Sequence, residues 1–228
     1  MEFSRMKGGM LGLVSGTHER VDSFQTTRQS NEMELRTRVE VSGIQRTPDG
    51  VDITEGKAAR EVINSRETVD MDSLSLTITD EEKVEREYTN FASINEKLVI
   101  VKGRSGRFLF EVLADRYGTP VEQASIDLDA LYEANRDAIP WKVGFYGHSD
   151  LARNGVIHGK EVLNDSDFGD VLQRAPKNQL GLIFDRPEHE EKVFLTRSGY
   201  VEIYQPVSYD TADFVRFLDD VVLPHASV

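Results

Sequence analysis

Cysteine is absent from this chain of 228 residues, and its absence excludes several kinds of chemistry. Disulfide bonds, thiolate nucleophiles, zinc sites with cysteine ligands and iron–sulfur clusters all need that side chain. Long apolar runs are missing too, because no stretch approaches the roughly 20 residues that a membrane-spanning helix needs. Two cations precede the apolar residues 10–14 as in a signal peptide, but that segment is far too short. We therefore expect a cytoplasmic protein with no membrane partner.

Complete catalytic and cofactor motifs are missing as well. The N-terminal glycines and Gly147 form neither a P-loop nor a G-x-G-x-x-G fingerprint, so the nucleotide-binding folds that depend on these motifs have no support. The sequence predicts no cofactor and no resident metal, and it favours a binding protein over an enzyme.

Basic residues are scarce relative to acidic ones. The chain has 27 Lys and Arg against 40 Asp and Glu, which gives a net charge of −13. This excess disfavours a protein that coats nucleic acid or an anionic membrane by bulk charge, although a local basic groove is compatible with it. With 39% hydrophobic residues, the chain has the composition of a folded globular protein rather than a disordered one.

The most informative stretch is residues 97–118. Its first part, LVIV at 98–101, predicts a buried strand because four consecutive branched residues suit a strand covered on both faces. Residues 107–117 fit two structures. In a helix, Phe108 and Val112 form an i,i+4 pair and Gly118 provides the stop; in a strand, Phe108 and Val112 share one face of a hairpin. We favour the helix because the segment exceeds the usual strand length.

A glycine-bracketed basic loop lies between this strand and the predicted helix. Backbone N–H groups at the helix N-terminus and the three cations of the loop predict a small site for a phosphate or nucleic acid. The alternative is a solvated turn. The GxxG loop of KH domains differs because it lies between two helices, and a G-x-S-x-G elbow needs glycine where Arg107 stands. The residues of this predicted site are Lys102, Arg104, Ser105 and Arg107.

Alternation of apolar and polar residues governs the rest of the first half. Residues 33–41 and 51–53 predict a hairpin across the turn at 47–50, and residues 74–78 predict a second amphipathic strand. Residues 1–32 are expected to be a flexible lead-in, and residues 56–65 a short helix. The acidic run at 79–87 predicts a solvated helix start, with a partner-binding segment as the alternative.

The second half has a more regular pattern. Strands are predicted at 142–146, 156–163, 179–184, 192–196 and 200–204, and helices at 128–136, 166–172 and 210–223. This order indicates an α+β protein with a largely antiparallel sheet, helices on one face of it, and a β-rich N-terminal region. A shift in charge between residues 67 and 90 predicts two parts, 1–90 and 91–228, with a single domain as the alternative.

One short motif points to catalysis. His158, Lys160 and Asp165 match H-x-K-x-x-x-x-D, which is similar to the half-site motif of the phospholipase D superfamily. The resemblance implies that the histidine attacks phosphorus and the lysine binds phosphoryl oxygens, because a neutral nucleophile needs a fixed cation beside it. The match covers eight residues in one copy, without the G-S-x-N segment. A metal-independent phosphodiesterase or nuclease is therefore the alternative function.

The aromatic residues on the predicted strands fit core packing under the C-terminal helix, with a stacking platform for single-stranded nucleic acid as the alternative. They are Phe145, Phe194, Tyr200 and Tyr204. Tyr200 and Tyr204 share a face with Glu202 and are expected to be exposed. A metal site of His148, Asp150 and His158 is disfavoured by the distance between these residues along the predicted hairpin.

The leading hypothesis is a non-enzymatic binding or adaptor protein with a protein partner, and with a local phosphate or nucleic-acid contact at the basic loop.

Overall fold

The computed structural model of the chain describes residues 5–16, 20–30, 33–47, 49–72, 75–94, 97–147 and 154–228. Within these residues, twelve strands form one sheet whose pairings are all antiparallel. Its order is β10-β9-β11-β12-β13-β1-β6-β5-β4-β3-β2, and β7 also pairs with β1. The largely antiparallel sheet predicted from the sequence is therefore confirmed.

The first strands of the sheet are β1 (Gly8–Val14), β2 (Phe24–Ser30), β3 (Met33–Arg46), β4 (Asp52–Asp72), β5 (Ser75–Ile94) and β6 (Leu98–Val101). They are followed by β7 (Val121–Gln123), β9 (Ile139–Tyr146), β10 (Asn154–His158), β11 (Lys177–Asp185), β12 (Glu190–Thr196) and β13 (Tyr200–Gln205). A separate pair joins β8 (Ser125–Ile126) to β14 (Ala226–Ser227). The α-helices are α1 (Phe108–Tyr117), α2 (Leu128–Ala134), α3 (Gly169–Arg174) and α4 (Thr211–Phe217), which continues as a π-helical turn over Leu218–Val222.

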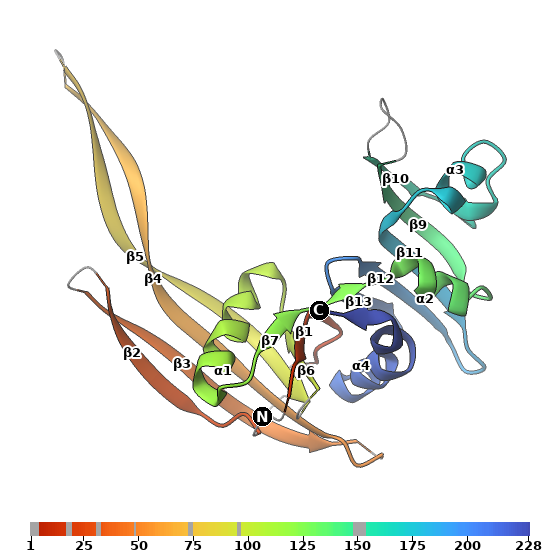
Figure 1. The fold of residues 1–228 in the computed structure, drawn as a ribbon, viewed down its shortest axis with the longest axis horizontal. Coiled ribbons are helices and arrows are strands. Elements are labelled where there is room, and N and C mark those ends of the chain that lie inside the picture. The colour runs from red at the N-terminus through yellow and green to blue at the C-terminus, as the bar shows by residue number, and fades with distance from the viewer. Residues whose placement is uncertain are drawn as a thin grey trace.

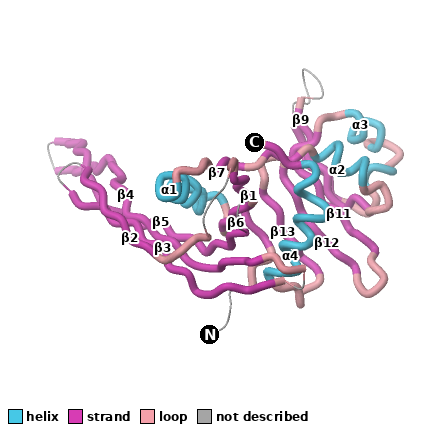
Figure 2. Tube along the Cα trace, turned by 60° about the horizontal axis from the view of Figure 1, so that its bottom comes forward, coloured by secondary structure: helices cyan, strands magenta, loops and turns pink. Residues whose placement is uncertain are grey.

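Helices lie on both faces of the sheet, which corrects the expectation that they cover one face. In β6, Val99 and Val101 are buried in a core cluster with α1, whereas Leu98 and Ile100 are buried in a second cluster with α4. Successive strand residues point to opposite faces, so α1 and α4 must cover opposite sides. Figures 1 and 2 show α1 beside β4 to β6, and α2, α3 and α4 at the β9 to β13 end.

The predicted helix in residues 108–117 is confirmed, and its start and end follow from glycines. Gly118 adopts the left-handed conformation that ends α1, with φ 69°. Gly106 is buried in the 3₁₀ turn before the helix, and a Cβ there would lie 2.4 Å from Thr89 Oγ1. A side chain at position 106 would therefore clash with β5 where the chain turns from β6 into α1.

The flexible lead-in expected for residues 1–32 is wrong for residues 8–14 and 24–30, which form strands β1 and β2, and β1 is the central strand between β13 and β6. Its glycines permit close packing rather than flexibility. A Cβ on Gly9 would lie 2.6 Å from Val101 O, and one on Gly12 would lie 2.7 Å from the Phe110 ring. The high glycine content of this segment therefore suggested a loop, whereas the glycines are needed because neighbouring elements leave no room for side chains.

Residues 56–65 and 79–87 are strands, not the helices that the sequence predicts. They belong to β4 and β5, which pair residue by residue from Ile53 with Ile94 to Asp72 with Ser75. Continuous pairing satisfies the backbone groups of both segments, and this outweighs the local preference of the acidic run for helix. Leu76 and Ile78 lie in the predicted amphipathic strand, whereas Leu74 lies outside the described residues.

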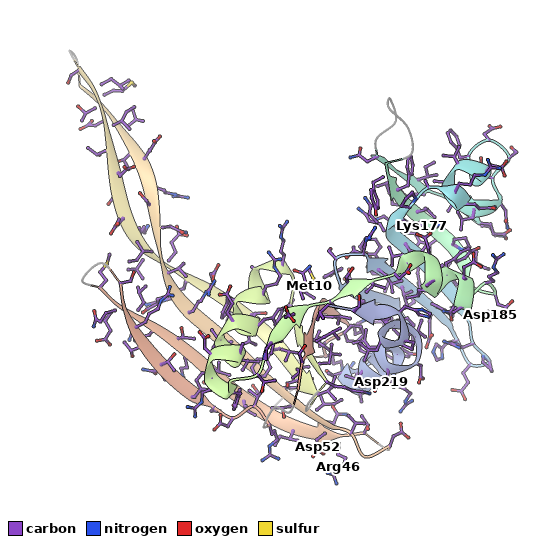
Figure 3. All side chains as sticks on the ribbon, in the orientation of Figure 1. Met10, Arg46, Asp52, Lys177, Asp185 and Asp219 are labelled. Atoms are coloured by element: carbon purple, nitrogen blue, oxygen red, sulfur yellow. The ribbon has the colours of Figure 1, made fainter. Side chains whose placement is uncertain are left out.

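The hairpin predicted from residue 33 to residue 54 is confirmed by the pairing of β3 with β4. An ion pair closes it, with Arg46 Nε 2.7 Å from Asp52 Oδ1, and the two side chains lie together in Figure 3. The predicted division between residues 90 and 91 falls within β5, and it stays a prediction. No helix among the described residues has the length and apolar character needed to cross a membrane.

Candidate functional site

The β9 to β13 end of the sheet has one covered face and one open face. Val193 and Leu195 of β12 are buried in the core with α4, so Lys192 and Phe194, which alternate with them, point to the opposite face. On β13, Val201 is buried in the same core, and Tyr200 and Tyr204 lie on the opposite side. We call this open surface the aromatic–lysine face and define it by Trp141, Lys142, Lys192, Phe194, Tyr200 and Tyr204.

Trp141 reaches this face through a bulge in β9. Pairing with β11 shifts register there, with Lys142 opposite Gly181 but Pro140 opposite Leu182, so Trp141 is the extra residue. The indole then occupies the space over Gly181, where a Cβ would lie 2.5 Å from the ring. Its Nε1 donates a hydrogen bond to Val193 O at 3.2 Å. The bulge, the glycine and this bond therefore fix the orientation of the ring.

Lysine side chains lie directly over the rings of the aromatic–lysine face. Lys142 Nζ is 4.0 Å from the centroid of Phe194, and Lys192 Nζ is 4.4 Å from that of Trp141. Both distances are within the range of cation–π attraction. The rings themselves form two pairs, since Trp141 lies 6.0 Å from Tyr204 and Phe194 lies 6.3 Å from Tyr200. Positive charge and flat apolar surface thus alternate among side chains of β9, β12 and β13.

A groove of about 360 Å³ adjoins the face at β13. The N-terminal segment and the loop after β6 contribute cations to its walls, and β13 contributes Tyr200 and Tyr204. Glu202 is the one carboxylate among its described lining residues, and it accepts a hydrogen bond of 3.1 Å from the Tyr200 hydroxyl. The groove therefore has a net positive wall in an otherwise acidic chain. Its basic residues are Arg5, Lys7 and Lys102.

Burial changes the acidity of groups on the face. It raises the pKa of Tyr200 to about 12 and raises the pKa of Tyr204, so both phenols are neutral donors at physiological pH. Burial also lowers the pKa of Lys142, because its ammonium group lies over the Phe194 ring rather than in bulk water. A bound anion beside Lys142 would stabilise the charged form of that lysine.

The predicted basic loop divides between two roles. Lys102 lines the groove, and Arg104 and Ser105 are exposed in the 3₁₀ turn. Arg107 instead donates a hydrogen bond of 2.6 Å to Gln123 Oε1, and the Gln123 amide donates one of 2.6 Å to Ser198 O. Arg107 thereby links the start of α1 to β7 and to the β12–β13 turn. The structure brings Lys102 close to Tyr200 and Tyr204, a proximity that the sequence did not predict.

The His158, Lys160 and Asp165 motif is not assembled as the half-site resemblance implies. The predicted strand at 156–163 ends at His158, and Glu161 turns the chain with a left-handed φ of 52°. Lys160 therefore lies in the turn and not two residues along a strand from His158. Asp165 Oδ1 accepts hydrogen bonds of 3.0 Å from the backbone N–H groups of Asp167 and Phe168, which gives it a local role. His158 itself lies 6.2 Å from Trp141, at the edge of the aromatic–lysine face.

The remaining predicted sites have simpler outcomes. Phe145 is buried in the core, whereas Phe194, Tyr200 and Tyr204 lie on the open face. Among the described residues, no group of three acidic or histidine side chains is arranged to hold a metal. His148 and Asp150 lie outside the described residues, so that metal hypothesis has no described geometry.

A second polar cluster escaped sequence reasoning. Tyr209 donates a hydrogen bond to Glu191, lies 2.9 Å from His189 Nε2, and burial raises its pKa. Arg186 Nε is 3.0 Å from Glu191 Oε2. These contacts join the β11–β12 turn to the start of α4 beside a pocket of about 500 Å³. No sequence motif relates residues that come together only through the β11–β12 hairpin and the chain before α4.

The two features that define the candidate site are the alternation of lysines with rings and the basic groove beside Tyr200. Both depend on the order of strands in the sheet, and neither forms a local sequence motif. Comparison with protein-family models, curated protein sequences and solved structures finds no match to this chain. The chemistry of the site therefore has to be argued from its own geometry.

Proposed function

We propose that this chain is a non-enzymatic binding protein that takes up single-stranded nucleic acid on the aromatic–lysine face. The observation that carries the proposal is the placement of Lys142 Nζ 4.0 Å from the Phe194 ring and of Lys192 Nζ 4.4 Å from the Trp141 ring. Proteins bind single strands through aromatic platforms for the bases and cations for the phosphates. Here each lysine of one strand lies over a ring of the other, across the intervening strand β11.

The groove would let a bound nucleic-acid strand extend beyond the aromatic–lysine face. Lys102 of the basic loop, with Lys7 and Arg5, provides cations beyond Tyr200 for further phosphates. The neutral phenols of Tyr200 and Tyr204 offer ring surface along the way. The net charge of −13 limits non-specific attraction from the rest of the chain, so binding depends on this face.

The experiment is a salt series of oligonucleotide binding, measured by fluorescence anisotropy with a labelled poly-thymidine strand. Lys142→Ala/Lys192→Ala should weaken binding and reduce the magnitude of the log K against log salt slope by about 1.4, since each phosphate contact on a single strand contributes about 0.7. The matched control is Lys57→Ala/Lys83→Ala, which removes two exposed lysines away from this face. The control should keep the slope.

Two results would overturn this proposal. Equal losses in the two double variants would mean that binding follows net charge and not the face. Absence of binding by the wild type at low salt would remove the nucleic-acid part, and would leave an adaptor with a protein partner as the function.

A further inference from the structure

A two-stranded arm projects from the sheet in Figures 1 and 2. It consists of residues 64–72 of β4 and 75–83 of β5, paired from Asn64 with Lys83 to Asp72 with Ser75. The pairing of β3 with β4 ends at Arg60, so neither arm strand has a second neighbour among the described residues. Nine residues per strand at about 3.3 Å each give the arm a reach of about 30 Å.

The two faces of the arm differ at its tip. Directly opposite residues of an antiparallel pair lie on the same face, so the pairs Val69–Ile78 and Met71–Leu76 form one apolar face. The opposite face at the same level is polar, with Thr68 opposite Thr79 and Asp70 opposite Thr77. The four apolar side chains are Val69, Met71, Leu76 and Ile78, and they are 57%, 76%, 61% and 58% exposed.

The contacts within such a two-stranded ribbon contribute little stability. A two-stranded hairpin is marginally stable in water unless another layer covers its apolar face. No described element covers the arm, and Figure 3 shows its side chains projecting on both sides away from the remainder of the protein. A contiguous exposed apolar surface marks an interaction site. We infer that the apolar tip of the arm docks into an apolar recess, rimmed by basic side chains, on a different protein.

Charge identifies that partner. Residues 64–83 contain six acidic and two basic side chains. Glu67 lies directly opposite Asp80, on the apolar face and next to the Val69–Ile78 pair. Like charges directly opposite destabilise a sheet, and basic residues around the recess would relieve that repulsion. An anionic membrane or a nucleic acid would be repelled by the same acids, and a second copy of the chain would bring two acidic sets together.

Site-specific photo-crosslinking in the cells that produce the protein tests this inference. A photoreactive residue replaces Met71 on the apolar face or, as a matched control, its neighbour Asp70 on the polar face. We expect an adduct from position 71 to one other protein, at a peptide with more basic than acidic residues. Position 70 should give about tenfold less adduct than position 71. High salt should remove the position-71 adduct.

A pair of double variants provides the second readout. Val69→Thr/Ile78→Thr keeps β-branched residues but removes apolar surface, and it should reduce the position-71 adduct about tenfold. Thr68→Ser/Thr79→Ser changes the opposite face at the same level and should leave the adduct unchanged. Equal adducts from positions 70 and 71, no adduct at either, or adducts to lipid or nucleic acid would overturn the inference. Adducts between isotope-labelled and unlabelled copies of this chain would overturn it too.

Discussion

Lys142 Nζ lies 4.0 Å from the centroid of the Phe194 ring, although the two residues belong to strands that are separated by β11. Gly181 of β11 makes this contact feasible because it carries no side chain between them, and a Cβ there would lie 2.9 Å from Lys142 Cβ. The open face is therefore organised around a glycine, with a lysine and an indole packed over it. This arrangement leads to the first prediction.

Gly181→Ala should displace Trp141 from the aromatic–lysine face, because the added Cβ would lie 2.5 Å from the indole ring. We expect a loss of stability of about 1–3 kcal/mol from overpacking, together with weaker oligonucleotide binding. The measurements are near-ultraviolet circular dichroism, urea unfolding and anisotropy. A variant that binds as tightly as the wild type with a displaced indole would show that Trp141 is not a stacking surface.

The core beneath α4 should be sensitive to truncation. Phe214 and Leu218 are fully buried, and we expect each change to alanine to lower the free energy of unfolding by about 2–5 kcal/mol. Val207, which is exposed, is the matched control, and Val207→Ala should change stability by less than about 0.5 kcal/mol. Urea unfolding measures all three variants. Losses as small as the control at both core positions would contradict the packing described for α4.

Glu55 should make the protein less stable as pH rises. The side chain is buried, its Oε1 accepts a hydrogen bond from Thr211, and Oε2 has no hydrogen-bond partner among the described residues. Burial raises the pKa of this carboxyl above its ordinary value of 4.5. A carboxyl group with a higher pKa in the folded state binds its proton more tightly when folded. Its contribution is therefore most favourable at low pH and declines as pH rises through the raised pKa.

The variant Glu55→Gln should remove this pH dependence and should be more stable than the wild type at neutral pH, because a neutral amide replaces a buried carboxylate. Denaturant unfolding at a series of pH values above 4.5 measures the effect. Glu122→Gln, at an exposed position outside the arm, is the control and should follow the wild-type curve. An unchanged slope in Glu55→Gln would show that Glu55 does not titrate in this way.

Removal of the arm should leave the rest of the protein folded. Ile63 is paired with Val84, so a two-residue Asn-Gly turn between them would replace residues 64–83 and close the hairpin. None of the arm side chains that the structure describes is buried, and we expect the free energy of unfolding to change by no more than about 1 kcal/mol. Chemical unfolding followed by circular dichroism measures this. A large loss of cooperativity would mean that the arm is part of the folding unit.

Much of the second half was predictable from the sequence because its signals are local. The helix cap at Asp127 accepts hydrogen bonds from the backbone of Asp129 and Ala130, and Asp210 forms a capping box with Asp213. The β12–β13 hairpin followed from alternation around a turn. Each of these elements is specified by residues a few positions apart, and for that reason their types were predicted correctly.

The arm and the aromatic–lysine face could not be predicted in the same way. An exposed two-stranded ribbon has no buried face to set a pattern, so acidic residues 79–87 matched a helix start although they pair across to β4. The face depends on strand order and on a bulge at Trp141, neither of which has a sequence signal. Lys102 and Tyr200 were each noted as candidates, but their proximity arises from the pairing of β1 with β13 and β6.

Trp141 is the single tryptophan of the chain, so its fluorescence reports on the proposed site alone. The most direct measurement is a titration of the full chain with poly-thymidine of about 12 nucleotides, within the range that one binding module covers. We expect saturable quenching of the emission at low salt, reversal by added salt, and weaker quenching in Lys142→Ala/Lys192→Ala than in Lys57→Ala/Lys83→Ala. An emission spectrum that does not change at saturating oligonucleotide would contradict nucleic-acid stacking on the aromatic–lysine face.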